Sequence, residues 1–174
     1  AIDLTKGATG LTCFNAKTGE KYSYNGDYVL STMPIKDLCQ ALNQKISIPE
    51  EILKISDGLV YRDFITVGLL LNSLDLEGTK KDGIKDNWIY IQDNDVKMAR
   101  LQIFNNWSPF MVKDKNTYWL GLEFLCFETD DFWKKSDDDI INQGVKELVK
   151  LGIIKESEVL DQTIIRMPKA YPSY

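Results

Sequence analysis

The sequence predicts an α+β fold, with a mostly antiparallel mixed sheet of about six strands and flanking helices. Three strand-like segments follow one another at 88–92, 99–105 and 117–128, separated by Asp, Asn, Lys and Pro turns. Strands that succeed one another without helices between them favour antiparallel neighbours. A capped helical pattern at 136–152 supplies a helix to flank the sheet. At 174 residues the chain can form one domain with a sizeable core.

The first elements along the chain are a hairpin, a strand and a helix. "LTCFN" and "KYSY" alternate around the turn "AKTGE", which predicts a β-hairpin, and "GDYVLST" at 26–32 predicts a strand. Pro34 can begin a helix, because proline suits the first helical position. Apolar residues then recur at helical spacing: Ile35, Leu38, Cys39 and Leu42.

A second short helix and the longest strand follow. In "PEEILKI" at 49–55, Pro49 begins the helix, the two glutamates favour its N-terminal dipole, and Gly58 lies beyond its end. The segment 59–74, "LVYRDFITVGLLLNSL", is rich in β-branched and aromatic residues and predicts a strand. "EGTKKDGIKDN" at 77–87 predicts an exposed loop.

The C-terminal elements are a helix and a last strand. Ser136 and Asp139 form a capping box, positions 141, 145 and 148 share an apolar face, and Gly152 can close the helix. We therefore interpret the aspartates as helix capping rather than metal binding. The segment 159–174 predicts one more strand followed by a proline-broken aromatic tail.

Composition excludes several classes of function. The net charge of −5 comes without a basic stripe, which disfavours nucleic-acid binding. Histidine is absent, which removes Ser-His-Asp and Cys-His mechanisms and most zinc hydrolases unless a residue outside this sequence supplies the imidazole. The longest apolar run, 65–71, is too short to cross a bilayer, and no basic-then-apolar leader opens the sequence. We expect a cytoplasmic protein without membrane insertion.

The cysteines do not indicate a disulfide framework or a metal site. Cys13, Cys39 and Cys126 are odd in number, far apart and without CxxC spacing. No acidic cluster fits a calcium loop either. The interpretation is buried, reduced thiols and no metal.

Two strand faces combine an arginine with aromatic residues, because side chains alternate across a strand. Their members are Val60, Arg62, Phe64, Thr66 and Gly68 on one strand, and Arg100, Gln102, Phe104 and Asn106 on another. The guanidinium group suits bidentate contacts with phosphate or carboxylate. Alternatively both are ordinary strand arginines, one of them paired with Asp63 or Glu123.

Three further features each allow two interpretations. "RLQIFNNWSP" at 100–109 ends a strand in a polar-aromatic cluster, which is either a turn or a pocket wall. Glu123 is either a partly buried acid or base, or the partner of an arginine. Gly68 and Gly121 lie inside strands, which indicates a close approach of backbone or ligand, or else a bulge.

The sequence contains no nucleotide-binding fingerprint. There is no GxGxxG and no GxxxxGK[ST], and "KGATG" at 6–10 lacks a buried strand before it and a helix after it. If the protein uses a nucleotide cofactor, the binding domain lies elsewhere.

Four motifs, taken together, carry a resemblance to a known family. They are "YVLSTMPIKDL" at 28–38, "YRDFITVGLLL" at 61–71, "NWIYIQD" with "RLQIFNNWSPFMV" between 87 and 112, and "RMPKAYPSY" at 166–174. In this order they resemble the middle portion of FAD-dependent oxidoreductases of the amine oxidase and protoporphyrinogen oxidase superfamily. The nearest group is the bacterial proteins described as UDP-galactopyranose mutase-related. The resemblance covers nearly the whole chain.

The resemblance implies a substrate-binding domain inserted into a discontinuous flavin-binding domain. Residues 1–33 would be a hairpin and strand leading from the flavin domain, and residues 34–174 the substrate-binding domain, in a single compact unit overall. FAD would be bound by segments of the same chain absent from this sequence. The abrupt start and end of the sequence agree with that expectation.

The resemblance also suggests site residues by position. Substrate binding is implied for Tyr61, Arg62, Arg100, Asn105, Asn106, Trp107, Ser108, Glu123 and Tyr171. Proximity to the cofactor is implied for Thr32, Met33, Pro34 and Lys169. No catalytic residue is assigned, since the flavin would carry the difficult chemistry while this domain orients a small-molecule substrate and excludes water. We expect the isolated fragment to be inactive.

The reaction and the class of function stay open. The mutases carry histidines in the stretch that corresponds to residues 100–108, where this chain has none, so oxidase-like hydride transfer remains an alternative to mutase-like isomerisation of a nucleotide-sugar. A free-standing module that binds a sugar nucleotide or another acidic ligand is a second class. A structural interaction domain, with its aromatic faces buried against a partner, is a third.

Overall fold

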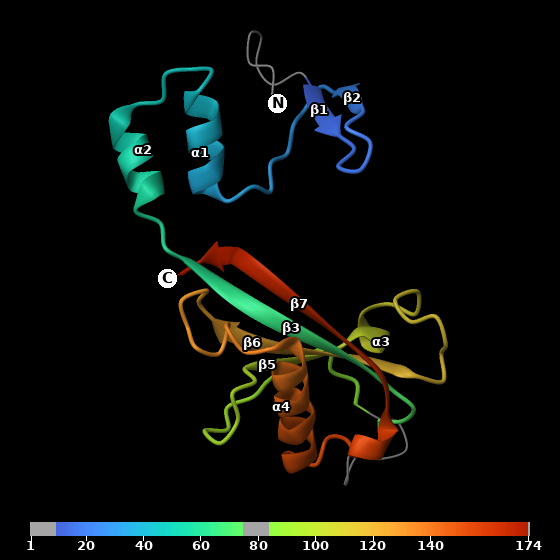
Figure 1. Cartoon of the computed structure of the whole chain (residues 1–174). Coiled ribbons are helices and arrows are strands. Elements are labelled where there is room, and N and C mark those ends of the chain that lie inside the picture. The colour runs from blue at the N-terminus through green and yellow to red at the C-terminus, as the bar shows by residue number, and fades with distance from the viewer. Residues whose placement is uncertain (1–9, 75–83, 174) are drawn as a thin grey trace. The chain divides into compact units, whose positions relative to one another are not determined.

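The computed structural model of this chain describes residues 10–74 and 84–173. The chain divides into two compact units, residues 1–60 and residues 61–174 (Figure 1). Each unit is described by itself below. The expected boundary after residue 33, and the role of 34–174 as a substrate-binding domain, stay predictions.

The first unit contains a hairpin and two helices, as predicted. Strands β1 (Gly10–Phe14) and β2 (Lys21–Asn25) pair antiparallel. Their turn is held by Asn15, whose Oδ1 accepts hydrogen bonds from the backbone N–H groups of residues 17 and 18 at 2.9 and 3.2 Å. Helices α1 (Ile35–Asn43) and α2 (Glu50–Asp57) each begin directly after a proline, which lacks the N–H that would be left unbonded there.

The strand expected at 26–32 is wrong. This segment is irregular in the structure, and Tyr28 and Leu30 are 88% and 91% exposed. A β-branched and aromatic pattern forms a strand only when a neighbouring strand supplies hydrogen bonds, and no described residue pairs with this segment.

The second unit is built on a five-stranded sheet in the order β4-β5-β6-β3-β7. Its strands are β3 (Tyr61–Leu71), β4 (Trp88–Tyr90), β5 (Arg100–Ile103), β6 (Tyr118–Cys126) and β7 (Val159–Pro172). Every pairing is antiparallel. The predicted α+β class and the mostly antiparallel sheet are confirmed, and the described strands, five in this sheet and two in the separate hairpin, are close to the predicted number of about six.

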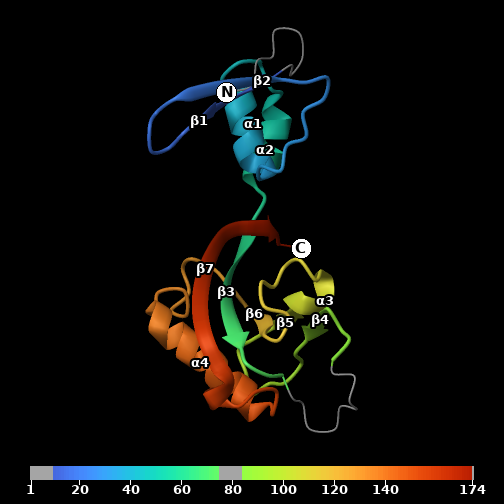
Figure 2. The ribbon, with the colours of Figure 1, turned by 90° about the vertical axis from the view of Figure 1, so that its right-hand side faces the viewer.

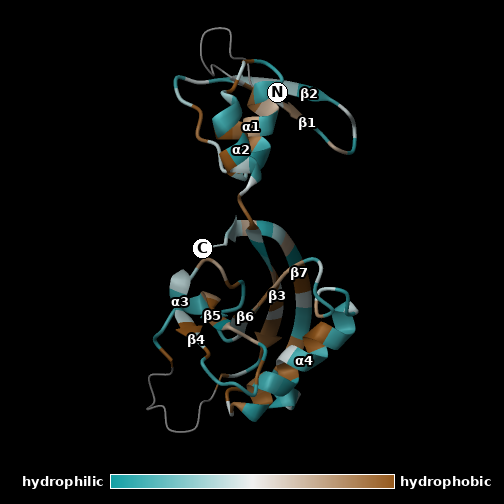
Figure 3. Ribbon diagram, turned by 90° about the vertical axis from the view of Figure 1, so that its left-hand side faces the viewer, coloured by the Kyte–Doolittle hydropathy of each residue, from teal (hydrophilic) through white to brown (hydrophobic). Residues whose placement is uncertain are grey.

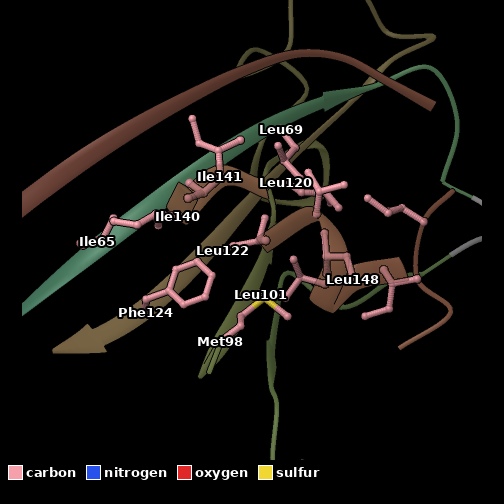
Figure 4. Packing of buried hydrophobic residues seen from close by; sticks show 14 of the residues in the cluster. Ile65, Leu69, Met98, Leu101, Leu120, Leu122, Phe124, Ile140, Ile141 and Leu148 are labelled. Carbon is pink, nitrogen blue, oxygen red and sulfur yellow. The ribbon is translucent and has the colours of Figure 1, made fainter. Parts of the chain in front are cut away.

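One face of this sheet packs against helix α4 (Asp137–Lys150) and forms the core (Figure 4). Ile65 and Leu69 of β3 and Leu122 of β6 are fully buried there with Ile140 and Leu148 of the helix. Each such side chain contributes roughly 1.5–3 kcal/mol by leaving water. Figure 3 shows the hydropathy of these elements: hydrophobic residues run along β3, and hydrophobic and hydrophilic residues alternate in α4.

Helix α4 has the ends that its sequence predicts. Ser136 is the N-cap, and its Oγ accepts a hydrogen bond from the backbone N–H of Asp139 at 3.2 Å. At the other end Gly152 has φ +69°, and the N–H of Ile153 donates to the carbonyl of Leu148 at 2.9 Å. This is the Schellman arrangement, in which glycine tolerates the left-handed conformation that closes a helix. The helix predicted at 136–152 is confirmed.

Strand β7 continues through the two prolines, so the expected proline-broken tail is wrong. The long strand curves beside β3 and reaches Pro172 (Figure 2). Between the pairs Arg62–Tyr171 and Phe64–Met167, β3 has one residue, Asp63, where β7 has the three residues 168–170. Pro168, which has no backbone N–H to donate to the sheet, lies within this irregular segment.

Asp63 explains how the irregularity is stabilised. Lys169 has a left-handed backbone, with φ +52°, and its N–H donates to Asp63 Oδ1 at 2.6 Å. Oδ2 of the same carboxylate accepts the N–H of Glu128 at 2.8 Å. A buried carboxylate therefore satisfies two backbone groups that the ladder leaves unbonded.

The remaining predictions concern an exposed loop, membrane spans and metal sites. Most of the loop predicted at 77–87 lies outside the described residues. Within 10–74 and 84–173, no helix has both the length and the apolar character needed to span a bilayer. The same residues contain no group of three or more His, Cys, Asp or Glu side chains arranged to hold a metal ion.

Candidate functional site

The face of the sheet opposite α4 carries residues of both strand faces that the sequence singles out, among them Arg62 and Thr66 of β3 and Arg100 of β5. We call it the open face. The register pairs Thr66 with Glu123, Gly68 with Gly121, and Arg100 with Glu123. Because residues directly opposite in neighbouring strands point to the same side, the strand faces predicted separately form one surface.

A pocket of about 200 Å³ lies on the open face. Four elements and one loop surround it, and its lining consists of Thr66, Gly68, Phe104, Met111, Trp119, Thr163 and Ile165. The polar groups of these side chains are the hydroxyls of the two threonines and the indole N–H of Trp119. This volume is below the range of roughly 300–1,000 Å³ typical of sites for drug-sized ligands, so the space suits a small ligand or one ring of a larger one.

Two glycines allow aromatic rings to lie directly on the sheet. A Cβ atom on Gly121 would come within 2.9 Å of the Phe104 ring. A Cβ atom on Gly68 would come within 2.8 Å of Thr163 Cγ2 and 3.4 Å of the Trp119 ring. The close approach at both glycines is made by side chains of the pocket wall, and not by backbone or ligand as the sequence suggested.

Arg100 and Glu123 form a buried ion pair beside the pocket. Arg100 Nη2 lies 2.5 Å from Glu123 Oε2, and the two side chains are 15% and 5% exposed. Gln102 Nε2 donates a hydrogen bond to Glu123 Oε1, and the guanidinium carbon of Arg100 lies 4.7 Å from the ring centroid of Trp88. Of the two interpretations of Glu123, the geometry supports its role as the partner of an arginine. The pair is buried rather than exposed to solvent.

The cluster at 104–108 both turns the chain and shapes the pocket. Residues Phe104–Trp107 form the short helix α3, which ends β5 and places the Phe104 ring over Gly121. Asn105 Nδ2 donates to the carbonyl of Thr117 at 2.8 Å, and its Oδ1 accepts the N–H of Trp119 at 3.0 Å. The Asn105 amide thus fixes the start of β6 next to the pocket.

The remaining residues of this cluster also make contacts within the protein. Asn106 Nδ2 donates to the carbonyls of residues 84 and 86 at 2.8 and 2.9 Å. The ring of Trp107 lies 6.5 Å from that of Trp88, and Ser108 Oγ accepts the N–H of Phe110. Substrate contacts of residues 105–108 stay predictions.

A second group of predicted site residues lies at the start of β3. Tyr61 is opposite Pro172 and Arg62 is opposite Tyr171. The guanidinium carbon of Arg62 lies 5.3 Å from the ring centroid of Phe127. Tyr61 Oη and Arg62 Nε are buried and have no hydrogen-bond partner among the described residues. Lys169 is in the nearby irregularity of β7, so the fold brings these residues together at a different part of β3 from the pocket.

The other residues expected near a cofactor belong to the first unit. Thr32, Met33 and Pro34 precede α1, Met33 is 44% exposed, and its N–H donates to Ser31 Oγ. Their proximity to a flavin stays a prediction.

No residue assigned to substrate binding from the sequence is among the lining residues, and three lining residues, Met111, Thr163 and Ile165, were not singled out at all. Thr163 and Ile165 alternate along β7, so the period of two contained a signal that could have found them. Met111 lies in the loop after α3, where no periodicity applies. Its position in the pocket depends on tertiary structure alone.

Two solved structures share the fold of this chain. A reduced UDP-galactopyranose mutase matches with a TM-score of 0.60 and 20% sequence identity, over 93% of this chain and 32% of that chain. A proposed protoporphyrinogen oxidase from an Exiguobacterium species matches with a TM-score of 0.57 and 17% identity, over 87% of this chain and 31% of that chain. At such identities the likeness shows the fold alone.

The chain spans about a third of the length of each of these two structures. No protein-family model matches the sequence, and no curated protein matches it.

Proposed function

We propose that this chain is the substrate-binding domain of a flavin-dependent oxidoreductase of the amine oxidase superfamily, or of a mutase-like relative. The observation that carries the proposal is the pocket on the open face, bounded by aromatic side chains over Gly68 and Gly121. The motifs at 61–71, 100–112 and 166–174 supply residues along or beside this face. The shared fold with a mutase and a proposed oxidase is consistent with this role.

The residues of this chain do not fit a flavin site of their own. The sequence has no dinucleotide fingerprint, and the pocket lining contains no cationic side chain to meet a pyrophosphate. In the proposed protein, FAD is bound by other segments of the same chain and supplies the redox chemistry.

The role of this chain is then to bind and orient the substrate. A largely apolar pocket displaces water from the reacting group, and the rigid strands of the sheet hold the pocket walls in place. Such a role requires no acid or base from this chain. A cytoplasmic location belongs to the same proposal.

A free-standing binding module is the second candidate function. The observation that favours it is that the pocket lining lies entirely between residues 66 and 165 of one compact unit. Such a pocket could bind a ligand without a flavin domain.

The two candidates differ in what the complete gene product contains. After purification and gel filtration, we expect the complete product to retain the visible absorption spectrum of bound flavin, and residues 1–174 alone to show none. A complete product without flavin, even after reconstitution with FAD, would exclude the flavoenzyme and leave the binding module.

A further inference from the structure

The lining of the pocket on the open face is mostly apolar. Five of its seven lining residues, all but the two threonines, present hydrocarbon, aromatic, thioether or backbone atoms: Gly68, Phe104, Met111, Trp119 and Ile165. The indole N–H of Trp119 is the one strong side-chain donor among these five. Thr66 and Thr163 offer one hydroxyl and one methyl group each. A ligand that fills such a space gains from burying apolar surface and finds few polar partners.

Arg100, on the open face beside the pocket, is not available for an anion. Arg100 is paired with Glu123, and its guanidinium group is covered by Trp88. To bind a phosphate it would have to leave a buried carboxylate without its counter-charge, which is strongly unfavourable. Arg62 belongs to the group at the start of β3 and is not part of the pocket lining.

Anions are disfavoured for a second reason. A diphosphate loses its hydration when it enters a pocket, so it requires cationic groups or clustered N–H donors to replace the water. The pocket lining has no Lys or Arg, and the chain carries a net charge of −5.

The walls favour a flat ligand. The Trp119 ring lies against Gly68 and the Phe104 ring against Gly121, so two aromatic surfaces border the space above the glycine pair. Aromatic rings pack well against other rings and against apolar edges. A single polar substituent on the ligand can be met by a threonine hydroxyl.

We infer that the pocket binds an uncharged, apolar ring with at most one hydrogen-bonding group, and not the diphosphate of a nucleotide-sugar. Its role as the substrate site rests on the proposed function, but binding itself does not. In that setting the substrate presents an apolar ring to Thr66, Gly68 and Thr163.

Met111 gives a local test on the 174-residue chain. The chain has four methionines, of which Met111 lines the pocket and Met98 is buried in the core on the other side of the sheet. With ¹³C-methyl methionine the chain gives four signals, which single Met→Leu variants assign. The probes are indole, UDP and inorganic pyrophosphate.

Indole should shift the Met111 signal saturably and leave the Met98 signal in place, while UDP and pyrophosphate leave Met111 unmoved. Thr163→Phe fills the space above Gly68 and should weaken indole binding by about tenfold or more. The matched control Gln162→Phe adds the same ring on the adjacent exposed residue outside the lining and should keep the wild-type affinity.

Two outcomes would overturn the inference. A saturable Met111 shift with UDP or pyrophosphate would show an anion site, and no shift with indole would show that the pocket is not a ring site. Neither outcome depends on flavin, so failure of this inference is distinct from failure of the proposed function.

Discussion

At the scale of single residues, Arg100 and Glu123 show that charged side chains on the open face can pair with each other within the fold rather than bind a ligand. Their Oε2–Nη2 contact of 2.5 Å lacks hydrogen-bond alignment, and Arg100 Nε is buried with no hydrogen-bond partner among the described residues. Such a pair adds little net stability, yet losing one member leaves the other charge buried alone.

Replacing Glu123 alone should therefore be costly. We expect Glu123→Gln to lower the free energy of unfolding by about 3 kcal/mol, measured by urea denaturation, because Arg100 loses its counter-charge. Replacing both residues, as Arg100→Met with Glu123→Leu, should restore stability to within about 1 kcal/mol of wild type. A single variant as stable as wild type would contradict the pair seen in the structure.

Cys126 is the residue for which the structure predicts a pH effect. Burial, followed by the charges of Asp130 and Asp63, raises the pKa of the Cys126 thiol from its ordinary value of 9.0. The unfolded chain therefore ionises this thiol at lower pH than the folded chain. The stability contributed by the neutral thiol is complete below pH 9.0 and is lost as pH rises from there through the folded pKa.

Unfolding midpoints measured from neutral to alkaline pH test this sign. Cys126→Ala should be less stable at neutral pH because of the cavity, but its stability should fall less steeply above the ordinary thiol pKa. Cys13→Ala, at an exposed cysteine, is the matched control and should keep the wild-type slope. Equal slopes in all three proteins would show that Cys126 ionises alike in both states.

At the scale of elements, the irregularity in β7 depends on Asp63. Its carboxylate bonds two backbone N–H groups, those of Lys169 and Glu128. Asp63→Ala should cost about 2–4 kcal/mol, because it leaves both groups buried without partners. Hydrogen exchange should also accelerate at these two amides. Asp161→Ala, at an exposed position of the same strand, should cost less than about 0.5 kcal/mol. Similar effects of the two variants would contradict the role of Asp63.

The elements also show what local pattern can predict. Ser136, Asp139 and Gly152 fixed both ends of α4 from the sequence alone, since caps act within a few residues. The segment 26–32 carries a strand-like pattern but forms no strand in the described residues, because a strand also needs a partner. The continuation of β7 past Pro168 was missed because it depends on a residue distant in sequence, Asp63, which accepts the N–H of Lys169.

At the scale of the whole molecule, strand register is what the sequence could not supply. Alternation correctly placed Arg62 with Thr66 and Gly68 on one strand face, and Arg100 with Gln102 on another. Only the pairing of Gly68 with Gly121 and of Arg100 with Glu123 shows that these faces form one surface. The pocket could not be predicted, because Met111 and Thr163 reach it from a loop and an edge strand far away in sequence.

The central claim is that the open face holds a ligand against a flavin bound by the rest of the protein. The most direct measurement is the visible flavin spectrum of the complete gene product, titrated with indole, in wild type, Thr163→Phe and Gln162→Phe. We predict a saturable perturbation in wild type and Gln162→Phe, and its loss in Thr163→Phe with flavin content unchanged. If indole shifts the Met111 methyl signal of the same protein but leaves the flavin spectrum unmoved in all three, the pocket does not face the flavin and the account is contradicted.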